Sequence, residues 1–198
     1  MAQTEFKDYL TIAREMTGKY LKLSEDDLQQ FADLIDGRCE LKKGEIFINE
    51  GMVCRHIIYV DKGLVRQYYY KEGHDVSEYF VCEGNSMHCI ESVYHHVPTH
   101  LLAEALEPTV IYTINYARLA DAIEKYPGLC RFYRIFQEED LIITQHKADA
   151  LRFESSKERY ERFLREYPEA ARRAPLQHIA SYLLMTPETL SRVRAGVL

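Results

Sequence analysis

The sequence predicts an α+β protein with an N-terminal antiparallel β-barrel or jelly roll, a long helix and an all-α C-terminal domain. Three observations support this fold class. Short β-rich runs punctuated by glycines fill the region from Gly37 to about Ile114. An apolar residue then recurs every seven positions from Leu129 to Ala150. The segment Leu176–Arg194 divides into two short amphipathic helices joined by a tight turn.

The composition is that of an ordinary globular protein. Of the 198 residues, 46% are hydrophobic and 28% are charged, close to the averages for soluble domains. No apolar run reaches the length of a membrane span, and the N-terminus lacks the layout of a signal peptide. The five cysteines include no C-x-x-C pair, which argues against a disulfide framework. We therefore expect no membrane contact and a place in the reducing cytoplasm.

Charge is unevenly distributed along the chain. The whole sequence carries a net charge of −6. From Arg152 onward, however, nine Lys or Arg residues outnumber six Asp or Glu residues. An acidic body joined to a basic C-terminal segment is consistent with nucleic-acid contacts that are confined to one end of the molecule.

The first half of the chain is predicted to be β-rich and to begin with helices. Residues 1–20 are amphipathic, and Ser24 is placed to cap a second helix. Asp61-Lys62-Gly63 and Lys71-Glu72-Gly73 are predicted to be hairpin turns that end in a glycine of positive φ. Closing the strands into a barrel covers their edges and leaves room inside for a small ligand. The expected strands are Ile46–Ile48, Ile57–Val60, Leu64–Tyr70, Val76–Val81, Leu101–Leu106 and Val110–Ile114.

A long helix is expected from about Gly128 to Arg152, after a helix capped by Asn115 and a break at Pro127. Its heptad column makes half of a coiled-coil seam, so we expect this helix to pair with its copy in a second chain. The alternative is a helix that packs only on its own barrel. The residues of this column are Leu129, Phe136, Ile143 and Ala150.

The expected domains follow from these elements. Residues 1–127 form the barrel with its flanking helices, residues 128–152 the long helix, and residues 153–198 the C-terminal domain. A hinge is expected at Phe153–Ser156, directly before a helix that Ser155 and Glu158 begin with a capping box.

The C-terminal pair of helices has the outline of a helix-turn-helix. Apolar residues one turn apart give each helix a buried side, and Thr186-Pro187-Glu188 is a strong start for the second helix. Gly196 is placed to end that helix. The alternative is a helical hairpin packed into a core. DNA binding is favoured because the exposed side of the second helix carries groups that suit bases and phosphates: Glu188, Thr189, Ser191, Arg192 and Arg194.

This order of parts resembles the Crp/Fnr family of bacterial transcription regulators over nearly the whole chain. In the barrel the resemblance rests on Lys43-Gly44-Glu45, Asn49-Glu50-Gly51, Asp61–Arg66 and Cys82–Asn85, and in the C-terminal domain on Ile179–Leu183 and Thr186–Arg192. It implies a cyclic-nucleotide-binding-like barrel that senses an effector, a homodimer joined along the long helix, and binding to double-stranded DNA. RNA polymerase is the further partner that it implies.

The family's recognition helix carries the pattern E-x-x-S-R, which falls on Glu188, Ser191 and Arg192. The resemblance implies that these three residues contact base edges. Their chemistry agrees, because arginine binds guanine through two hydrogen bonds and glutamate accepts from the cytosine amino group. Contacts to backbone phosphates are expected from Thr186, Thr189, Arg194, Arg172 and Arg173.

The chain departs from the family pattern at the turn and at the C-terminus. Many members have glycine in the turn where this chain has Leu184, so we expect Leu184 to adopt the left-handed conformation at a cost of about 1–2 kcal/mol. Little sequence follows Arg194, so we expect a DNA-binding domain without a β-wing.

A third departure concerns the effector. Members that bind cyclic nucleotides use an acidic residue for the ribose and an arginine for the phosphate. In the matching stretch Glu91 supplies the acid, but Pro98-Thr99-His100 stands where the arginine is expected. Without a guanidinium the phosphate lacks its charge-assisted partner, so we expect no tight binding of cyclic AMP and predict no cofactor. The candidates for an effector pocket are Gly84, Glu91, Thr99, His100, Thr144 and Gln145.

Histidines crowd one part of the same stretch. Some members of the family carry haem or a metal, but these histidines lack the spacing of a metal site, and we expect ordinary side chains. The scattered cysteines do not form an iron–sulfur cluster pattern. Two other functions stay open: a cupin-like metal-dependent barrel enzyme, which lacks its ligand spacing, and an effector-binding module without DNA contacts. No catalytic motif is present, so we expect no enzyme. The histidines are His88, His95, His96 and His100.

Overall fold

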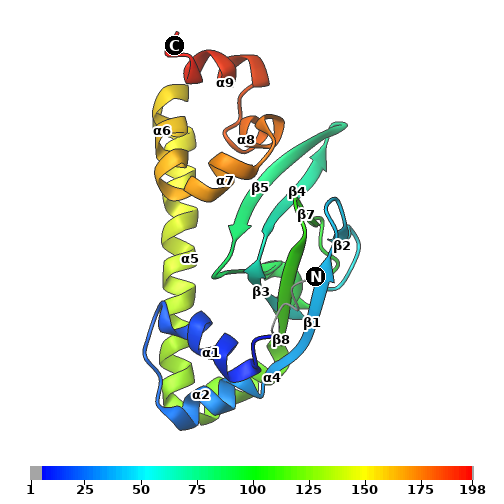
Figure 1. The fold of residues 1–198 in the computed structure, drawn as a ribbon, viewed down its shortest axis with the longest axis vertical. Helices are drawn as coiled ribbons and strands as arrows, with labels where there is room; N and C mark the ends of the chain where they lie inside the picture. Colours follow the sequence, from blue (N-terminus) through cyan, green and yellow to red (C-terminus); the bar gives the residue numbers. More distant parts are fainter. Residues whose placement is uncertain (1–5, 198) are drawn as a thin grey trace.

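The computed structural model describes residues 6–197 and has the predicted order of parts. Figure 1 shows the long helix α5 (Pro127–Phe153) running along one side of the molecule. The helices α1 (Tyr9–Gly18) and α2 (Glu25–Ala32) lie near its start, and the C-terminal helices lie at its other end. Both N-terminal helices begin at a capping side chain, that of Asp8 for α1 and that of Ser24 for α2.

Two four-stranded antiparallel sheets form the barrel. The first has the order β1 (Ile35–Leu41), β8 (Thr109–Asn115), β3 (His56–Lys62) and β6 (Asn85–Met87). The second has the order β2 (Ile46–Ile48), β7 (Leu102–Ala105), β4 (Leu64–Lys71) and β5 (His74–Cys82). The six strands that the sequence predicted are present. The sequence did not predict β1, β6 or the short helix α3 (Ile90–His95).

One of the two predicted hairpin turns is confirmed. Glu72 and Gly73 have φ angles of 52° and 80°, and they join β4 to β5 as a two-residue hairpin loop of the kind that needs positive φ at both positions. The prediction for Asp61-Lys62-Gly63 is wrong, because β3 and β4 belong to different sheets. Gly63, at φ 101°, turns the corner between the sheets, where a Cβ would lie 2.8 Å from the Pro108 carbonyl oxygen.

The long helix packs on its own chain along the predicted heptad column. Leu129 and Phe136 lie in a core with α1, α2 and α4 (Tyr116–Lys125), and Ala150 is also buried. Ile143 is 39% exposed and lines a cavity beside the barrel. The column therefore does not offer a free surface to a second chain, because burial within the protomer already covers most of it. An apolar side chain on the opposite flank, Leu141, is 67% exposed.

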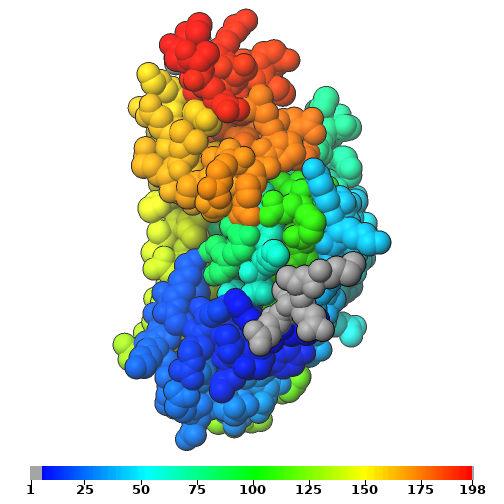
Figure 2. Space-filling view, viewed as in Figure 1, coloured from blue at the N-terminus to red at the C-terminus, as the bar shows by residue number. Residues whose placement is uncertain are grey.

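The C-terminal domain consists of α6 (Ser156–Glu166), α7 (Pro168–Arg173), α8 (Leu176–Tyr182) and α9 (Pro187–Arg194). The predicted capping box of Ser155 and Glu158 begins α6. This domain shares a core with the barrel, in which Leu64 and Phe80 meet Phe163 and Ile179. Figure 2 shows the α7 and α8 residues in orange directly against the cyan and green residues of the barrel.

The turn between α8 and α9 follows the expectation from the sequence. Leu184 has a φ of 50°, the left-handed conformation that glycine usually supplies. The Met185 N–H donates to the Ala180 carbonyl at 3.0 Å, which closes the end of α8. Gly196, at φ 70°, ends α9 in the same way. Among residues 6–197, none of the helices combines the length and apolarity that crossing a membrane requires.

Candidate nucleic-acid interface and ligand cavity

The helix α9 presents one polar face to solvent at the end of the molecule (Figure 1). Its other face is fixed, because Leu190 and Val193 are buried against the rest of the C-terminal domain. Thr186 caps the helix by accepting the Thr189 N–H at 3.2 Å. The exposed polar residues of this helix are Glu188, Ser191, Arg192 and Arg194.

The chemistry of this face suits the reading of bases. Glu188, Ser191 and Arg192 lie three and four positions apart, so they share one side of the helix. Hydrogen bonds from its own N–H and from the Thr186 hydroxyl lower the pKa of Glu188, and Arg192 lowers it further. The face thus offers a carboxylate acceptor, a hydroxyl and a guanidinium side by side. Thr186 and Arg194 are exposed beside it, and Thr189 is half-buried.

The two arginines before α8 differ in their surroundings. Arg172 is exposed and pairs with Glu169 on the same helix. The Arg173 guanidinium instead donates to Glu83 and to Glu107 of the barrel, each at 2.7 Å. These bonds raise the pKa of Arg173 and occupy its donors. Our prediction that Arg173 contacts a DNA phosphate therefore disagrees with this conformation, because the side chain ties α7 to the barrel.

The six effector-pocket candidates do not converge on one cavity. Glu91 and His100 are exposed at the surface of the barrel, and Gly84 forms the turn between β5 and β6. Thr99 is buried and accepts the Leu101 N–H at 3.1 Å. Thr144 and Gln145 are exposed on α5.

Side chains fill the interior between the two sheets. Cys54 and Cys89 are buried there among apolar residues. The Gln67 amide donates to the Cys89 sulfur at 3.5 Å.

The histidines of this stretch also remain apart. His95, His96 and His100 are exposed, whereas the His88 ring packs beside Phe136 with 6.1 Å between ring centroids. Burial lowers the pKa of His88. Within residues 6–197 no group of three His, Cys, Asp or Glu side chains has the arrangement that a metal ion needs.

A buried arginine at the end of the motif Asp61–Arg66, to which the sequence assigned no role, links the barrel to α8. The side chain of Arg66 is 1% exposed. Its guanidinium donates to Asp75 at 2.6 Å, to Glu104 at 3.0 Å and to the Ser77 hydroxyl at 2.8 Å. His178 of α8 lies 3.5 Å from the same guanidinium, and burial, followed by Arg66, lowers its pKa. The signal in the sequence is a charged residue inside the apolar run of β4.

Hydrogen bonds from α8 to β5 reinforce this link. The Ser77 N–H donates to the Ser181 hydroxyl at 2.9 Å, and that hydroxyl donates to the Asp75 carbonyl at 2.9 Å. The long helix is tied to the same strand, because Lys147 of α5 donates to the Glu78 carboxylate at 2.8 Å. The C-terminal domain is therefore held on β5 by polar contacts as well as by the shared core.

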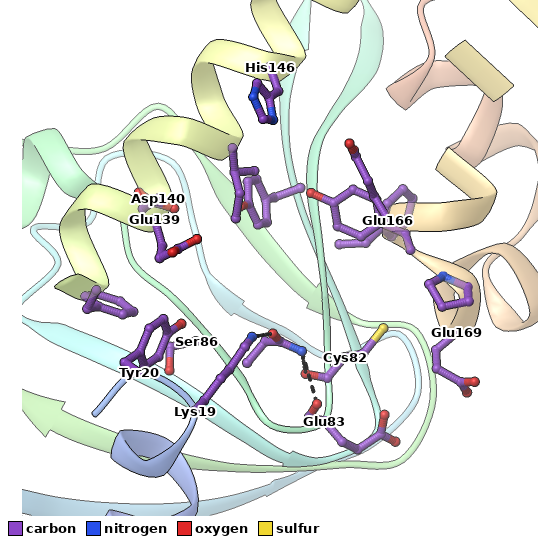
Figure 3. Close-up of a pocket in the computed structure, with 17 residues that line it drawn as sticks. Lys19, Tyr20, Cys82, Glu83, Ser86, Glu139, Asp140, His146, Glu166 and Glu169 are labelled. Atoms are coloured by element: carbon purple, nitrogen blue, oxygen red, sulfur yellow. Dashed lines mark hydrogen bonds between the residues drawn. The ribbon is translucent and has the colours of Figure 1, made fainter. Parts of the chain in front are cut away.

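A cavity of about 500 Å³ lies where the barrel, α5 and the C-terminal domain meet. Figure 3 shows Glu139, Asp140 and His146 on α5, with Tyr20 and Lys19 from the segment after α1 and Glu166 from α6 around the same space. Its size is in the range of sites for small molecules. None of the six effector-pocket candidates lines it.

Of the comparisons with known proteins, only the one with solved structures gives matches. No protein-family model and no curated protein sequence matches the chain. FixK2 from Bradyrhizobium japonicum is 21% identical, with a TM-score of 0.68 over 81% of this chain and 83% of that chain. The c-di-GMP-responsive regulator CLP of Xanthomonas campestris is 15% identical, with a TM-score of 0.68 over 88% of this chain and 91% of its own.

A protein from Eubacterium rectale that is assigned to the Crp/Fnr family is 16% identical, with a TM-score of 0.65 over 90% of this chain and 87% of its own. At these identities the likeness concerns the fold. It covers both the barrel and the C-terminal helices, as the sequence motifs predicted. The chain thus has the fold of the Crp/Fnr transcription regulators, with a cyclic-nucleotide-binding-like barrel, a long helix and a helical C-terminal domain.

Proposed function

We propose that this chain is a DNA-binding transcription regulator that reads a palindromic site as a homodimer. The observation that carries the proposal is the exposed face of α9, where Glu188, Ser191 and Arg192 stand together on a helix anchored by Leu190. A regulator of this kind works in the cytoplasm and acts on RNA polymerase, and a small-molecule effector sets its activity. Arg172, Arg194, Thr186 and Thr189 are the residues proposed to hold the DNA backbone.

The proposed dimer uses the flank of α5 on which Arg134, Leu141 and Thr144 are exposed. Arg134, Leu141 and Ala148 are seven residues apart, and so are Gln137, Thr144 and Leu151. Two such interleaved columns form a coiled-coil seam. Leu141 is the most exposed apolar side chain among them. Pairing here places Thr144 and Gln145 at or beside the seam, where an effector that changes the pairing has access to them.

Selection of binding sites from a random double-stranded DNA pool, with the full chain, tests the proposed function. We expect enrichment of two inverted half-sites whose centres are about 34 Å apart, one helical turn of DNA. Arg192→Ala should weaken binding to the selected site by about five- to 150-fold and relax the preference at one base pair.

Arg131→Ala is the matched control, because Arg131 is exposed on α5 near the opposite end of the molecule. It should leave binding unchanged. The proposal is wrong if no sequence is enriched. If Arg192→Ala weakens binding to every sequence equally, Arg192 contacts phosphate and does not read a base.

A further inference from the structure

Both aromatic rings and carboxylates line the cavity between the barrel, α5 and the C-terminal domain. Aromatic rings stand on two sides of it. Tyr20 packs edge-on against Phe136 with 5.5 Å between centroids, and Tyr79 packs edge-on against Tyr167 with 6.2 Å between centroids. Five carboxylates and one ammonium group lie among the lining residues, which are otherwise mostly apolar or aromatic. The cavity is therefore both aromatic and acidic.

Three of the five carboxylates already have cationic partners. Glu83 pairs with Arg173 at 2.7 Å, Glu166 pairs with Arg162 at 3.3 Å, and Glu169 pairs with Arg172. These side chains belong to the contacts that hold the C-terminal domain together and on the barrel. They leave little negative charge for a ligand.

The two carboxylates on α5 are different. Within residues 6–197, Glu139 and Asp140 form no hydrogen bond and no ion pair. Asp140 is close enough to Tyr20 and Tyr79 for its charge to raise the pKa of both phenols, although burial is the larger cause. The uncompensated charge thus lies between the two aromatic walls.

Three basic side chains lie near these carboxylates: Lys19 and His146, which line the cavity, and His88 beside Phe136. Lys19 donates to the Asn85 side-chain oxygen, and burial lowers its pKa although the nearby charge of Glu139 raises it in part. The His88 ring packs beside Phe136, and burial lowers its pKa although the charge of Asp140 raises it in part. Its Nε2 atom is buried and has no hydrogen-bond partner among the described residues. The cavity therefore holds two carboxylates that form no ion pair among the described residues, between two aromatic walls.

We infer that this cavity binds an organic cation, an ammonium or guanidinium group that carries an apolar body. Aromatic faces attract such cations, and the attraction grows when water is excluded. Glu139 and Asp140 supply the opposite charge, while Tyr20, Phe136, Tyr79 and Tyr167 surround the apolar part. The cavity lies outside the barrel interior, which Cys54, Gln67 and Cys89 fill. This inference does not depend on DNA binding, because the ligand site is complete in the free chain.

Calorimetric titration of the full chain with benzyltrimethylammonium tests the inference, with benzyl alcohol and benzoate as neutral and anionic counterparts of similar size. We expect saturable binding of the cation at millimolar concentration or below, and no binding of the other two compounds. The double variant Glu139→Gln, Asp140→Asn should weaken binding of the cation by about five- to tenfold.

Glu138→Gln is the matched control, because Glu138 is on the same helix but points to solvent and pairs with Arg134 at 3.7 Å. It should bind the cation as the unchanged chain does. Ile143→Trp fills the cavity from one wall and should abolish binding, and an unchanged circular-dichroism spectrum shows that the variant is folded. The inference is overturned if the cation does not bind, if all three compounds bind equally, or if the double variant binds as tightly as the control.

Discussion

Replacing Arg66 by methionine probes the buried polar link between the barrel and α8. Methionine keeps the unbranched apolar stem of the side chain but lacks the guanidinium, which removes three hydrogen bonds, to Asp75, Glu104 and the Ser77 hydroxyl. The guanidinium is almost fully buried. Its removal therefore leaves two carboxylates facing each other without a counter-charge.

The expected loss of stability follows from the exposure of these carboxylates. Removing one partner of a buried ion pair costs about 3–5 kcal/mol, because the other charge stays buried and unpaired. Glu104 is 17% exposed, whereas Asp75 is 41% exposed and partly regains water. We therefore expect a value near the lower limit, about 3 kcal/mol. The double variant Arg66→Met, Glu104→Gln should recover about 1–2 kcal/mol, because it also removes the stranded charge.

Urea unfolding followed by circular dichroism measures these differences. Arg131→Met is the control, since Arg131 is exposed and its replacement should change the free energy of unfolding by less than about 0.5 kcal/mol. A loss below about 1 kcal/mol for Arg66→Met would refute the reasoning, because it would mean that water reaches the guanidinium in the folded protein. A double variant less stable than Arg66→Met would also contradict it.

Three further predictions concern pH and assembly. Hydrogen bonds from Arg173 lower the pKa of Glu83 from 4.5 to about 2, so this pair stabilises the fold fully above about pH 4.5 and less as the pH falls toward 2. Glu83→Gln should flatten the free energy of unfolding across that window, and an unchanged acid profile would count against the pair. Burial and Arg66 lower the pKa of His178 below 6.5, so the folded state disfavours the charged ring and loses stability as the pH falls below about 6.5. His178→Gln should remove this loss, which urea unfolding at a series of pH values measures. Leu141→Glu should convert the dimer to a monomer in sedimentation experiments, because it places like charges in an apolar seam. Ile142→Glu, on the next face of α5, should leave the dimer intact, and equal effects of both substitutions would place the seam elsewhere.

Local signals in the sequence predicted most of the elements correctly. The caps at Ser24, Asn115, Ser155 and Thr186 are each made by the predicted side chain. The missed strands β1 and β6 are the two edges of their sheet. An edge strand needs no continuous apolar face. In β1 only the two end residues are buried, and the residues between them are exposed or half-buried. Periodicity therefore had no pattern to detect there.

For the candidate sites, too, local signals in the sequence predicted some features and missed others. The polar face of α9 was predictable because the cap, the anchoring leucine and the exposed groups all lie within one short helix. The role of Arg173 was not, because its partners Glu83 and Glu107 are distant in sequence and only the fold brings them together. The heptad column of α5 fits a seam between two chains and a core within one chain equally well. Packing of α1 and α2 against it decides between them.

The position of the contacts between the domains also bears on how a signal reaches α9. The hinge predicted at Phe153–Ser156 stays a prediction, whereas β5 and the residue after it contact the C-terminal domain directly. Ser77 and Glu83 are the barrel's partners for Ser181 and Arg173 of that domain, and Glu78 is the partner of Lys147 on α5. Tyr79, Phe80 and Cys82 of the same strand line the cavity. A ligand that displaces β5 therefore loosens several of these contacts together, whereas a change confined to the hinge leaves them in place. If an effector controls the proposed DNA binding, we expect its effect to reach α9 through β5.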